Sequence, residues 1–110
     1  MDMVKINQYE VFLISLDSSL ESEVAKTLPC VVVSPDEMNG FSKTLVVVPI
    51  TSKITSYPWR VPCVIANRSA SMATDQIKVV HRACIGLKIG KLSKHEIISL
   101  KDALHKMLID

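Results

Sequence analysis

Residues 22–35 read Ser-Glu-Val-Ala-Lys-Thr-Leu-Pro-Cys-Val-Val-Val-Ser-Pro, and they join the most polar loop of the chain to one of its most apolar runs. Cys30 to Val33 is apolar and mostly β-branched, which predicts a short strand buried on both faces. Pro29 and Pro35 enclose this run, so we expect strand pairing to start and stop at the prolines. The preceding loop brings charged and hydroxyl side chains to the rim of the core, where a rigid strand displays binding or catalytic groups.

The composition indicates one small domain, which we place at residues 1–110. A chain of 110 residues with 48% hydrophobic residues buries roughly two-thirds of the surface that its unfolded form exposes, so it is expected to fold without disulfides. Its net charge of +2 does not by itself indicate a nucleic-acid binder, and any nucleic acid has to be held at a local patch. No apolar run reaches the roughly 18 residues of a membrane span. We therefore expect a cytoplasmic protein with no membrane partner.

Three cysteines, Cys30, Cys63 and Cys84, lie within apolar runs and lack the C-x-x-C spacing of many metal sites. Their odd number and apolar surroundings indicate buried free thiols in a reducing cytosol. We therefore expect neither a bound metal nor a cofactor. The histidines fall on different expected elements, so we assign no histidine as a catalyst.

The rest of the chain predicts a mostly β fold. Strand composition is found at 10–16, 44–49, 59–65 and 74–81, and a short piece between Gly86 and Gly90 ends the sheet. The polar or small-residue segments between them, 17–28, 50–58 and 66–73, are expected to be loops or turns. Asn39-Gly40 favours the positive φ angles of a tight turn, so the strands on either side of it are expected to run antiparallel.

The end of the chain predicts a helix. Ser93-Lys94-His95-Glu96 fits a capping box, in which the serine and the glutamate satisfy each other's free backbone donors. Apolar residues then recur at helical spacing from Ile97 to Leu108, which predicts an amphipathic helix of roughly four turns. Five or so short strands followed by one helix form an α+β outline. We expect the strands to curl into a small barrel with the helix packed across it.

Several motifs follow one another along nearly the whole chain, from Tyr9 to Leu108. They are Phe12-Leu-Ile-Ser-Leu-Asp17, Ser22-Glu23, Pro29-Cys-Val-Val-Val-Ser-Pro35, Val48-Pro-Ile-Thr51, Tyr57-Pro58, Asp75-Gln76-Ile-Lys78 and the closing helix. In this order and spacing they resemble the MazF/PemK family of toxin endoribonucleases. The resemblance implies an SH3-like β-barrel with a C-terminal α-helix, a fold shared with the gyrase poison CcdB, and it implies a homodimer.

The resemblance also implies an activity and its partners. It predicts the toxin of a type II toxin-antitoxin system, which binds a cognate antitoxin and cleaves single-stranded RNA at specific sequences without metal, through the neighbouring 2'-hydroxyl. This chemistry needs a proton acceptor, a proton donor and groups that stabilise the charge of the phosphorane. Thr51 matches the family's phosphate-holding hydroxyl, Glu23 is the candidate carboxylate, and Leu28 occupies the position of the family's catalytic arginine. The remaining RNA-binding candidates are Ser22, Lys26, Thr27, Ser52, Lys53, Arg60, Asp75, Gln76 and Lys78.

Leu28 departs from the family pattern, because leucine can neither donate a hydrogen bond nor carry charge. The simplest interpretation is a toxin whose catalysis is attenuated, naturally or by design. The alternative is that Lys26 supplies the charge, although an ammonium lacks the bidentate fork of arginine. A CcdB-like gyrase-binding toxin and a non-cleaving RNA-binding homologue are the other functional alternatives.

Each candidate side chain also has a purely structural interpretation. Glu23 fits a solvated loop carboxylate, and Arg60 fits a solvated surface as well as it fits a phosphate contact. Asp75 fits the capping of a strand start as well as an RNA contact. Tyr57 and Trp59 fit either base stacking or a place in the core or in a dimer interface.

Overall fold

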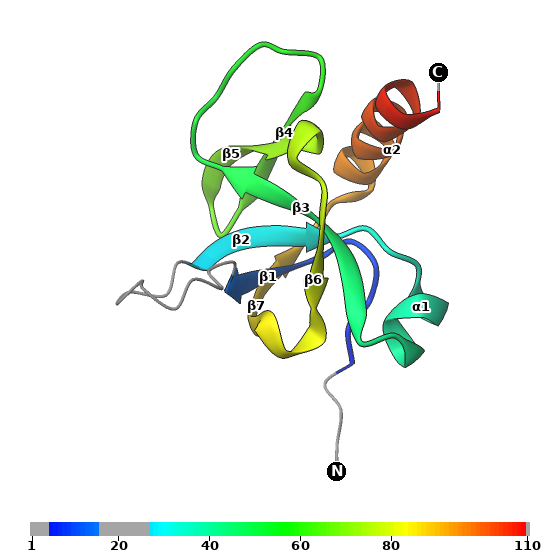
Figure 1. The fold of residues 1–110 in the computed structure, drawn as a ribbon. Coiled ribbons are helices and arrows are strands. Elements are labelled where there is room, and N and C mark those ends of the chain that lie inside the picture. The colour runs from blue at the N-terminus through cyan, green and yellow to red at the C-terminus, as the bar shows by residue number, and fades with distance from the viewer. Residues whose placement is uncertain (1–4, 16–26, 110) are drawn as a thin grey trace, which may run out of the picture.

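The computed structural model of the chain describes residues 5–15 and 27–109. These residues form seven strands, two α-helices and two short 3-10 turns (Figure 1). In chain order the elements are β1 (Glu10–Ser15), β2 (Thr27–Val32), α1 (Asp36–Phe41), β3 (Thr44–Thr51), β4 (Arg60–Ile65), β5 (Arg68–Ala73), η1 (Thr74–Gln76), β6 (Lys78–His81), η2 (Arg82–Cys84), β7 (Ile85–Lys91) and α2 (Lys94–Leu108).

The strands form one curled antiparallel sheet in the order β4-β5-β3-β2-β1-β7, and β6 pairs with β3 outside this path. Helix α2 packs beside β4 at one end of the sheet, and the short α1 lies at the other end (Figure 1). The expected α+β fold, mostly β with a small curled barrel and a C-terminal helix, is therefore confirmed. None of the described helices is long and apolar enough to cross a membrane.

Strand β3 holds the two parts of the sheet together, because it changes partners along its length. Its first residues pair with β6, and Cα partners Val47↔Val32 and Pro49↔Cys30 join its middle to β2. Its last two residues, Ile50 and Thr51, pair instead with β5. Strand β3 is eight residues long. This one strand therefore belongs to both parts of the sheet.

The central strands are buried on both faces, as the apolar run of β2 predicts. Val31 belongs to a cluster that includes Met72 of β5 and Leu100 of α2. Its neighbours Cys30 and Val32 belong to a second cluster on the opposite face. Successive side chains of a strand point to opposite faces, so one run of β-branched residues supplies both clusters.

The prediction that Pro29 marks the start of pairing is confirmed for β3, where pairing begins at Cys30, and is wrong for β1. Strand β2 begins at Thr27, and Pro29 lies opposite Leu13 of β1. The amide of Val33 donates to the carbonyl of Val46 in β3. Alternate residues of a strand direct their backbone N–H groups to the same neighbouring strand, so the position of Pro29 faces β3, as Val33 does. Pairing with β3 begins only at Cys30. The proline therefore removes no bond from the pairing with β1.

The prediction of a tight turn at Asn39-Gly40 is also wrong. These residues lie in α1, and no glycine among the described residues has a positive φ. The Asn39 side chain is buried, its amide nitrogen donates to the Ser34 carbonyl at 2.9 Å, and its amide oxygen accepts from the Ser34 hydroxyl at 2.6 Å. This side chain ties the short helix α1 to Ser34, which lies between β2 and α1. A helix therefore stands where the turn was predicted. The strands on either side, β2 and β3, are antiparallel as expected.

The segment 66–73, predicted to be a turn, is mostly strand β5. The turn is confined to Ala66 and Asn67, whose φ angles are 52° and 65°, and it joins β4 to β5 as a two-residue hairpin loop. The small residues that suggested a loop are needed here, because Ser71 is fully buried where β5 crosses the end of β3. The described residues form seven strands rather than the expected five or so, because β5 and the final piece β7 add to the others.

Smaller differences concern the neighbouring segments. The expected loop at 50–58 starts two residues late, because Ile50 and Thr51 belong to β3. The expected strand at 74–81 is divided into η1 and β6. Within β6 the buried residue is Val80, whereas Val79 is exposed. Strand β7 pairs with β1 and ends the sheet, as expected. A Cβ at Gly86 would lie 2.8 Å from the Leu13 carbonyl oxygen, so this position needs glycine.

The C-terminal helix agrees with its sequence signals. The Ser93 hydroxyl accepts from the Glu96 amide, and the Glu96 carboxylate accepts from the Ser93 amide, so the expected capping box is confirmed. The second Glu96 oxygen accepts from the Val64 amide at 2.8 Å and ties the helix to β4. Leu100 and Ala103 are the buried residues of α2.

The hairpin loop generates the first prediction. A two-residue loop with both φ angles positive favours asparagine or glycine, and an alanine in the left-handed region is strained. We expect Ala66→Asn to raise the free energy of unfolding by about 0.5–1 kcal/mol, measured by urea denaturation. Ala83→Asn is the control, because Ala83 is also exposed but has no positive φ. A gain of equal size in both variants would contradict the assignment of strain to Ala66.

A partly buried ion pair between β1 and β7 holds a carboxylate that also binds the first described segment. The Glu10 carboxylate accepts from Lys88 Nζ at 2.7 Å and from the Asn7 amide at 2.8 Å. Burial raises the pKa of Glu10, but the hydrogen bonds from Lys88 and Asn7 outweigh burial and leave this pKa below its ordinary value. The side chain of Glu10 is 11% exposed, whereas that of Lys88 is 49% exposed.

This pair generates the second prediction, on pH dependence. A carboxyl whose pKa is lower in the folded state stabilises the fold above its unfolded pKa of about 4.3, and this stabilisation is lost as the pH falls. Between pH 7 and pH 3 we expect wild type to lose about 1–2 kcal/mol more unfolding free energy than Glu10→Gln. The exposed Glu37→Gln is the control and should follow wild type. Equal pH profiles for wild type and Glu10→Gln would show that the pair contributes nothing.

Candidate nucleic-acid interface

A cleft opens where the end of β3 passes between β2 and β4. It has a volume of about 560 Å³. Its floor and one side are apolar, and its rim carries a hydroxyl pair, an ammonium, a guanidinium and an amide. The lining residues are Leu28, Pro29, Pro49, Ile50, Thr51, Ser52, Lys53, Arg60 and Gln76.

Strand pairing explains why these segments meet. The register Cys30↔Pro49 places the start of β2 beside the end of β3. The register Thr51↔Ser71 then carries the end of β3 onto β5, and β5 brings Arg60 of β4 with it. The cleft therefore forms at the point where β3 leaves one part of the sheet for the other.

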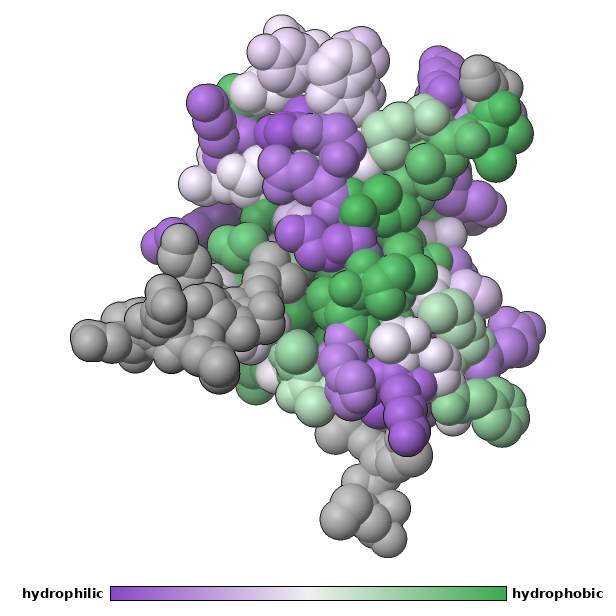
Figure 2. All heavy atoms as spheres, viewed as in Figure 1, coloured by the Kyte–Doolittle hydropathy of each residue, from purple (hydrophilic) through white to green (hydrophobic). Residues whose placement is uncertain are grey.

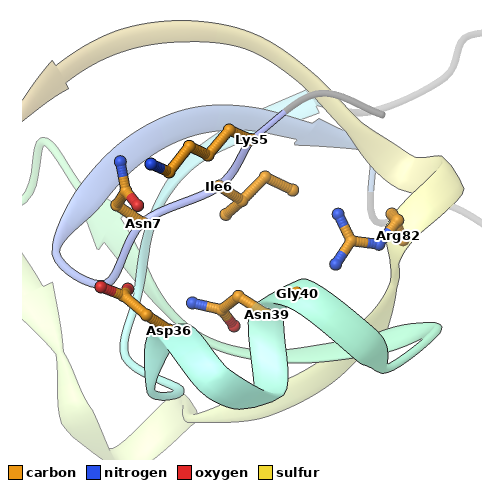
Figure 3. Close-up of a pocket in the computed structure, with 7 residues that line it drawn as sticks. All are labelled: Lys5, Ile6, Asn7, Asp36, Asn39, Gly40 and Arg82. Carbon is orange, nitrogen blue, oxygen red and sulfur yellow. The ribbon is translucent and has the colours of Figure 1, made fainter. Parts of the chain in front are cut away.

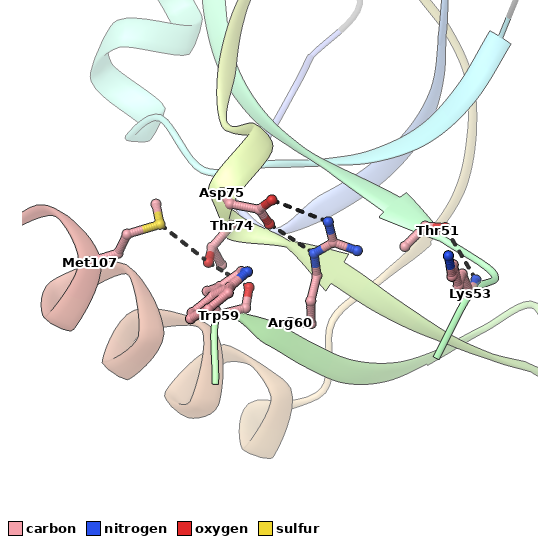
Figure 4. A network of polar contacts seen from close by, with 7 residues as sticks. All are labelled: Thr51, Lys53, Trp59, Arg60, Thr74, Asp75 and Met107. Carbon is pink, nitrogen blue, oxygen red and sulfur yellow. Dashed lines mark hydrogen bonds and ion pairs between the residues drawn. The ribbon is translucent and has the colours of Figure 1, made fainter. Parts of the chain in front are cut away.

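The Thr51 hydroxyl is held by the chain that follows it. The amide of Lys53 donates to Thr51 Oγ1 at 3.1 Å (Figure 4). The oxygen therefore acts as an acceptor in this bond, and the hydroxyl hydrogen stays available to donate. A threonine in this arrangement presents one oriented donor to the cleft.

The Arg60 guanidinium, another donor of the cleft, is held by Asp75. Its Nε and Nη2 atoms donate to the two Asp75 carboxylate oxygens at 2.8 Å and 3.1 Å (Figure 4). The hydrogen bonds from Arg60 are the main reason that the pKa of Asp75 lies below its ordinary value. A bidentate pair fixes the plane of the guanidinium, and three of its five N–H groups lie outside this pair.

A short chain of contacts runs from this ion pair to α2. Asp75 follows the fully buried Thr74, whose hydroxyl donates to the Trp59 carbonyl at 2.6 Å. The same hydroxyl lies 3.7 Å from the Met107 sulfur in α2 (Figure 4). Thr74 thus anchors Trp59, which precedes Arg60. It also fixes the start of Asp75, which follows Thr74 and bears the carboxylate.

The structure brings together six of the residues that sequence reasoning selected. Leu28, Thr51, Ser52, Lys53, Arg60 and Gln76 all line the cleft. Asp75 contacts it through Arg60. Thr27 and Lys78 are not among its lining residues: Thr27 begins β2 opposite Ser15, and Lys78 begins β6 opposite Val47. Ser22, Glu23 and Lys26 lie outside the described residues.

Lys78 instead lies close to a buried thiol. Burial raises the pKa of Cys30 to about 11, and the nearby charge of Lys78 opposes this rise. Burial likewise raises the pKa of Cys63 to about 12, with the charge of Glu96 adding to the effect. Both thiols are therefore protonated at neutral pH. All three cysteines are free, as expected, although Cys84 is only partly buried.

Leu28 is 41% exposed in the wall of the cleft. It therefore faces the same space as Thr51 and Arg60. A larger charged side chain at this position would extend into the cleft rather than into the core.

Two aromatic residues stack on each other near the cleft. The ring centroids of Tyr57 and Trp59 are 5.0 Å apart and their planes differ by 8°. Both rings are exposed, Tyr57 by 53% and Trp59 by 40%, so the prediction of a place in the core of this chain is wrong. They lie at the end of a loop, where the amide of Arg60 donates to the Tyr57 carbonyl.

Sequence reasoning missed the apolar part of the cleft. Pro29, Pro49 and Ile50 line it, yet in the sequence they belong to ordinary apolar runs. The antiparallel pairing of 30–33 with 44–49 was expected, but only the register Cys30↔Pro49 brings the start of β2 beside the end of β3. The sequence contains no local signal for that register.

The cleft combines donors with an apolar wall. An anionic phosphodiester fits the donors of Thr51, Lys53 and Arg60, and a base or ribose fits the apolar side. The described lining contains no carboxylate and no imidazole, so no side-chain proton acceptor of ordinary strength is found among these residues. Within the described ranges no three His, Cys, Asp or Glu side chains are placed to share a metal ion.

Comparisons with known proteins agree on one family. The model of the PemK-like, MazF-like toxin of type II toxin-antitoxin systems matches residues 7–108. No curated protein matches the chain.

Solved structures with the same fold support this match. An endoribonuclease from a mycobacterial species is 18% identical, with a TM-score of 0.80, over 96% of this chain and 93% of that chain. A mycobacterial endoribonuclease in complex with its cognate antitoxin is 17% identical, with a TM-score of 0.80, over 94% of each chain. A MazE-MazF structure from Deinococcus radiodurans is 17% identical, with a TM-score of 0.82, over 96% and 97%.

Proposed function

The chain belongs to the PemK-like, MazF-like toxins of type II toxin-antitoxin systems, and on this premise we propose that it is a metal-independent endoribonuclease for single-stranded RNA. The observation that carries the proposal is the cleft at the end of β3. It gathers Thr51, Lys53 and Arg60 beside an apolar wall. Such a combination suits a flexible strand whose phosphates meet donors and whose bases meet apolar surface.

The proposed reaction uses the RNA's own 2'-hydroxyl. Its oxygen attacks the adjacent phosphorus, a 2'-oxygen to phosphorus bond forms, and the bond from phosphorus to the 5'-oxygen breaks. The 2'-proton passes to an acceptor, and the leaving 5'-oxygen takes up a proton. The products are a 2',3'-cyclic phosphate and a free 5'-hydroxyl.

The described residues fit the electrostatic part of this reaction. Negative charge grows on the non-bridging oxygens in the transition state, and donors that are already oriented stabilise it without reorganisation. Thr51 is oriented by the Lys53 amide, and Arg60 is oriented by Asp75. Glu23, outside the described residues, is the candidate proton acceptor, because the described lining offers no carboxylate.

One observation favours a second candidate function, a non-cleaving RNA-binding homologue. Leu28 lies in the cleft wall at the position where the family resemblance expects arginine. A leucine there leaves the cleft with binding groups but without one source of transition-state stabilisation. We therefore propose that binding is retained and that cleavage by this chain is attenuated.

We propose two protein partners, a cognate antitoxin and a second copy of the chain. A structural neighbour is an endoribonuclease in complex with its cognate antitoxin. Figure 2 shows hydrophobic residues gathered over the middle of the sheet and at the C-terminal end of α2. Exposed apolar residues there include Val79, Leu108 and Ile109, and such surface is typical of an interface. A toxin that acts on messenger RNA works in the cytoplasm.

The leucine in the cleft generates the third prediction. Because one preorganised donor typically contributes about 100- to 1000-fold to such a reaction, we expect Leu28→Arg to raise cleavage of a mixed-sequence single-stranded RNA by at least that factor. The assay contains a chelator and follows the cyclic phosphate product. Leu87→Arg is the matched control, because Leu87 is 69% exposed in β7 and does not line the cleft.

Thr51→Ala in the Leu28→Arg protein should then reduce cleavage while thermal stability stays close to that of Leu28→Arg. If Leu28→Arg gives no gain and Lys26→Ala abolishes an activity already present, the cation has moved within the loop and the attenuation proposal is wrong. If neither protein cleaves but both bind RNA, the non-cleaving homologue is the correct function.

The cations of the cleft generate the fourth prediction. Binding of an uncleavable single-stranded RNA should weaken steeply as salt rises, because phosphate contacts release counterions. Lys53→Gln should weaken binding at low salt and reduce the salt slope by roughly one contact. Lys94→Gln is the control, since Lys94 is exposed at the start of α2 and does not line the cleft. A dissociation constant that does not change between low and moderate salt would contradict RNA binding.

A further inference from the structure

A second hollow lies at the other end of β3, between the first described segment and α1. It has a volume of about 400 Å³ and is lined by Lys5, Ile6, Asn7, Asp36, Asn39, Gly40 and Arg82 (Figure 3). It shares no lining residue with the cleft of the proposed ribonuclease site. The backbone amide of Arg82 donates to the Lys43 carbonyl just before β3 begins, which places this hollow eight strand residues away from the cleft.

The Arg82 guanidinium is the unusual group in this hollow. Its Nε donates to the Ser42 carbonyl at 3.3 Å, but its Nη2 atom is buried and has no hydrogen-bond partner. Figure 3 shows the guanidinium directed into the space between residues 5–7 and α1, facing Asn39. A buried charged donor without an acceptor is costly. An acceptor that reached this guanidinium would remove that cost.

Asn39 and Lys5 add donors to the hollow, and Figure 3 shows the Lys5 ammonium directed toward Asn7, across the hollow from Arg82. The fully buried Asn39 uses its amide oxygen and one amide hydrogen on Ser34, which leaves one amide hydrogen that is not used in these bonds. The ammonium of Lys5 adds a second positive charge to the lining. Buried Ile6 supplies an apolar surface beside the guanidinium.

The single acidic group of the lining is engaged elsewhere. Asp36 Oδ1 accepts from the Gln8 amide at 2.7 Å, and Gln8 is held in turn by the Val33 carbonyl. In Figure 3 the Asp36 carboxylate points away from Arg82. The lining therefore carries two positive charges and one negative charge, which favours an anion with a single charge over a phosphate with two.

From these observations we propose that this hollow is a binding site for a carboxylate, with Arg82 as its main partner. A guanidinium presents two parallel N–H groups that match the two oxygens of a carboxylate. A volume of about 400 Å³ holds more than a bare carboxylate, so the ligand is a small carboxylic acid or an acidic side chain with part of its peptide. The proposal is independent of the ribonuclease activity.

The experiment is a titration of the full chain followed by NMR of arginine Nε–Hε and asparagine side-chain signals. The probes are acetate, a blocked glutamate with both ends capped, methyl phosphate, and chloride at matched ionic strength. We expect acetate and blocked glutamate to shift the Arg82 and Asn39 signals in a saturable way, with dissociation constants of about 1 mM. Tighter binding of the blocked glutamate would identify a protein side chain as the source, and equal binding would identify a free acid.

Two variants make the test specific. Arg82→Gln should weaken carboxylate binding by at least about tenfold, and Arg68→Gln is the matched control, because Arg68 is exposed at the start of β5. Should Arg82→Gln fail to fold, Arg82→Lys keeps the charge but loses the fork, and it should still weaken binding. Shifts that do not saturate, that chloride reproduces, or that persist in both Arg82 variants would overturn the proposal. Tighter binding of methyl phosphate than of acetate would also overturn it.

Discussion

The pairing of β3 with three other strands is the constraint on which this structure depends. One eight-residue strand lies against β6 and β2 in its first part and against β5 at its end. Because backbone N–H and C=O groups must be paired when buried, the change of partners along β3 keeps these groups paired where one part of the sheet gives way to the other. The buried run Val47 to Ile50 marks this point, and it supplies side chains to both clusters.

The hollows at the two ends of β3 follow from this arrangement. At the end of β3 the exchange of partners opens the cleft that holds Thr51 and Arg60. At its start, α1 and the first described segment enclose the hollow at Arg82. The two arginines are in opposite situations: Arg60 is satisfied by both oxygens of Asp75, whereas Arg82 keeps a buried nitrogen without an acceptor. The first is preorganised as a rigid donor, and the second is arranged to receive a ligand.

Short polar contacts position both arginines more than apolar packing does. Thr74 is buried and bonds to the Trp59 carbonyl, which fixes the segments on either side of the Arg60 and Asp75 pair. Ser34 and Asn39 play the same part for α1 and the hollow beside it. In both places a buried side chain closes a short segment back onto the sheet. The geometry of each site therefore depends on satisfied buried polar groups, which are costly to disrupt.

The sequence by itself determined the elements with strong local signals. The capping box at Ser93 set the start of α2, and the β-branched run at Cys30 to Val32 required burial on both faces, because these signals act between near neighbours. The family resemblance and the cations that flank the second polar loop together selected six of the residues that line the cleft. Only the tertiary structure decided the rest, namely the register that places Cys30 opposite Pro49, the strand at 68–73 and the helix at Asn39-Gly40. The register and the strand depend on pairing with β3, and the helix is accompanied by buried side-chain bonds between Ser34 and Asn39. Local propensity carries no record of such partners.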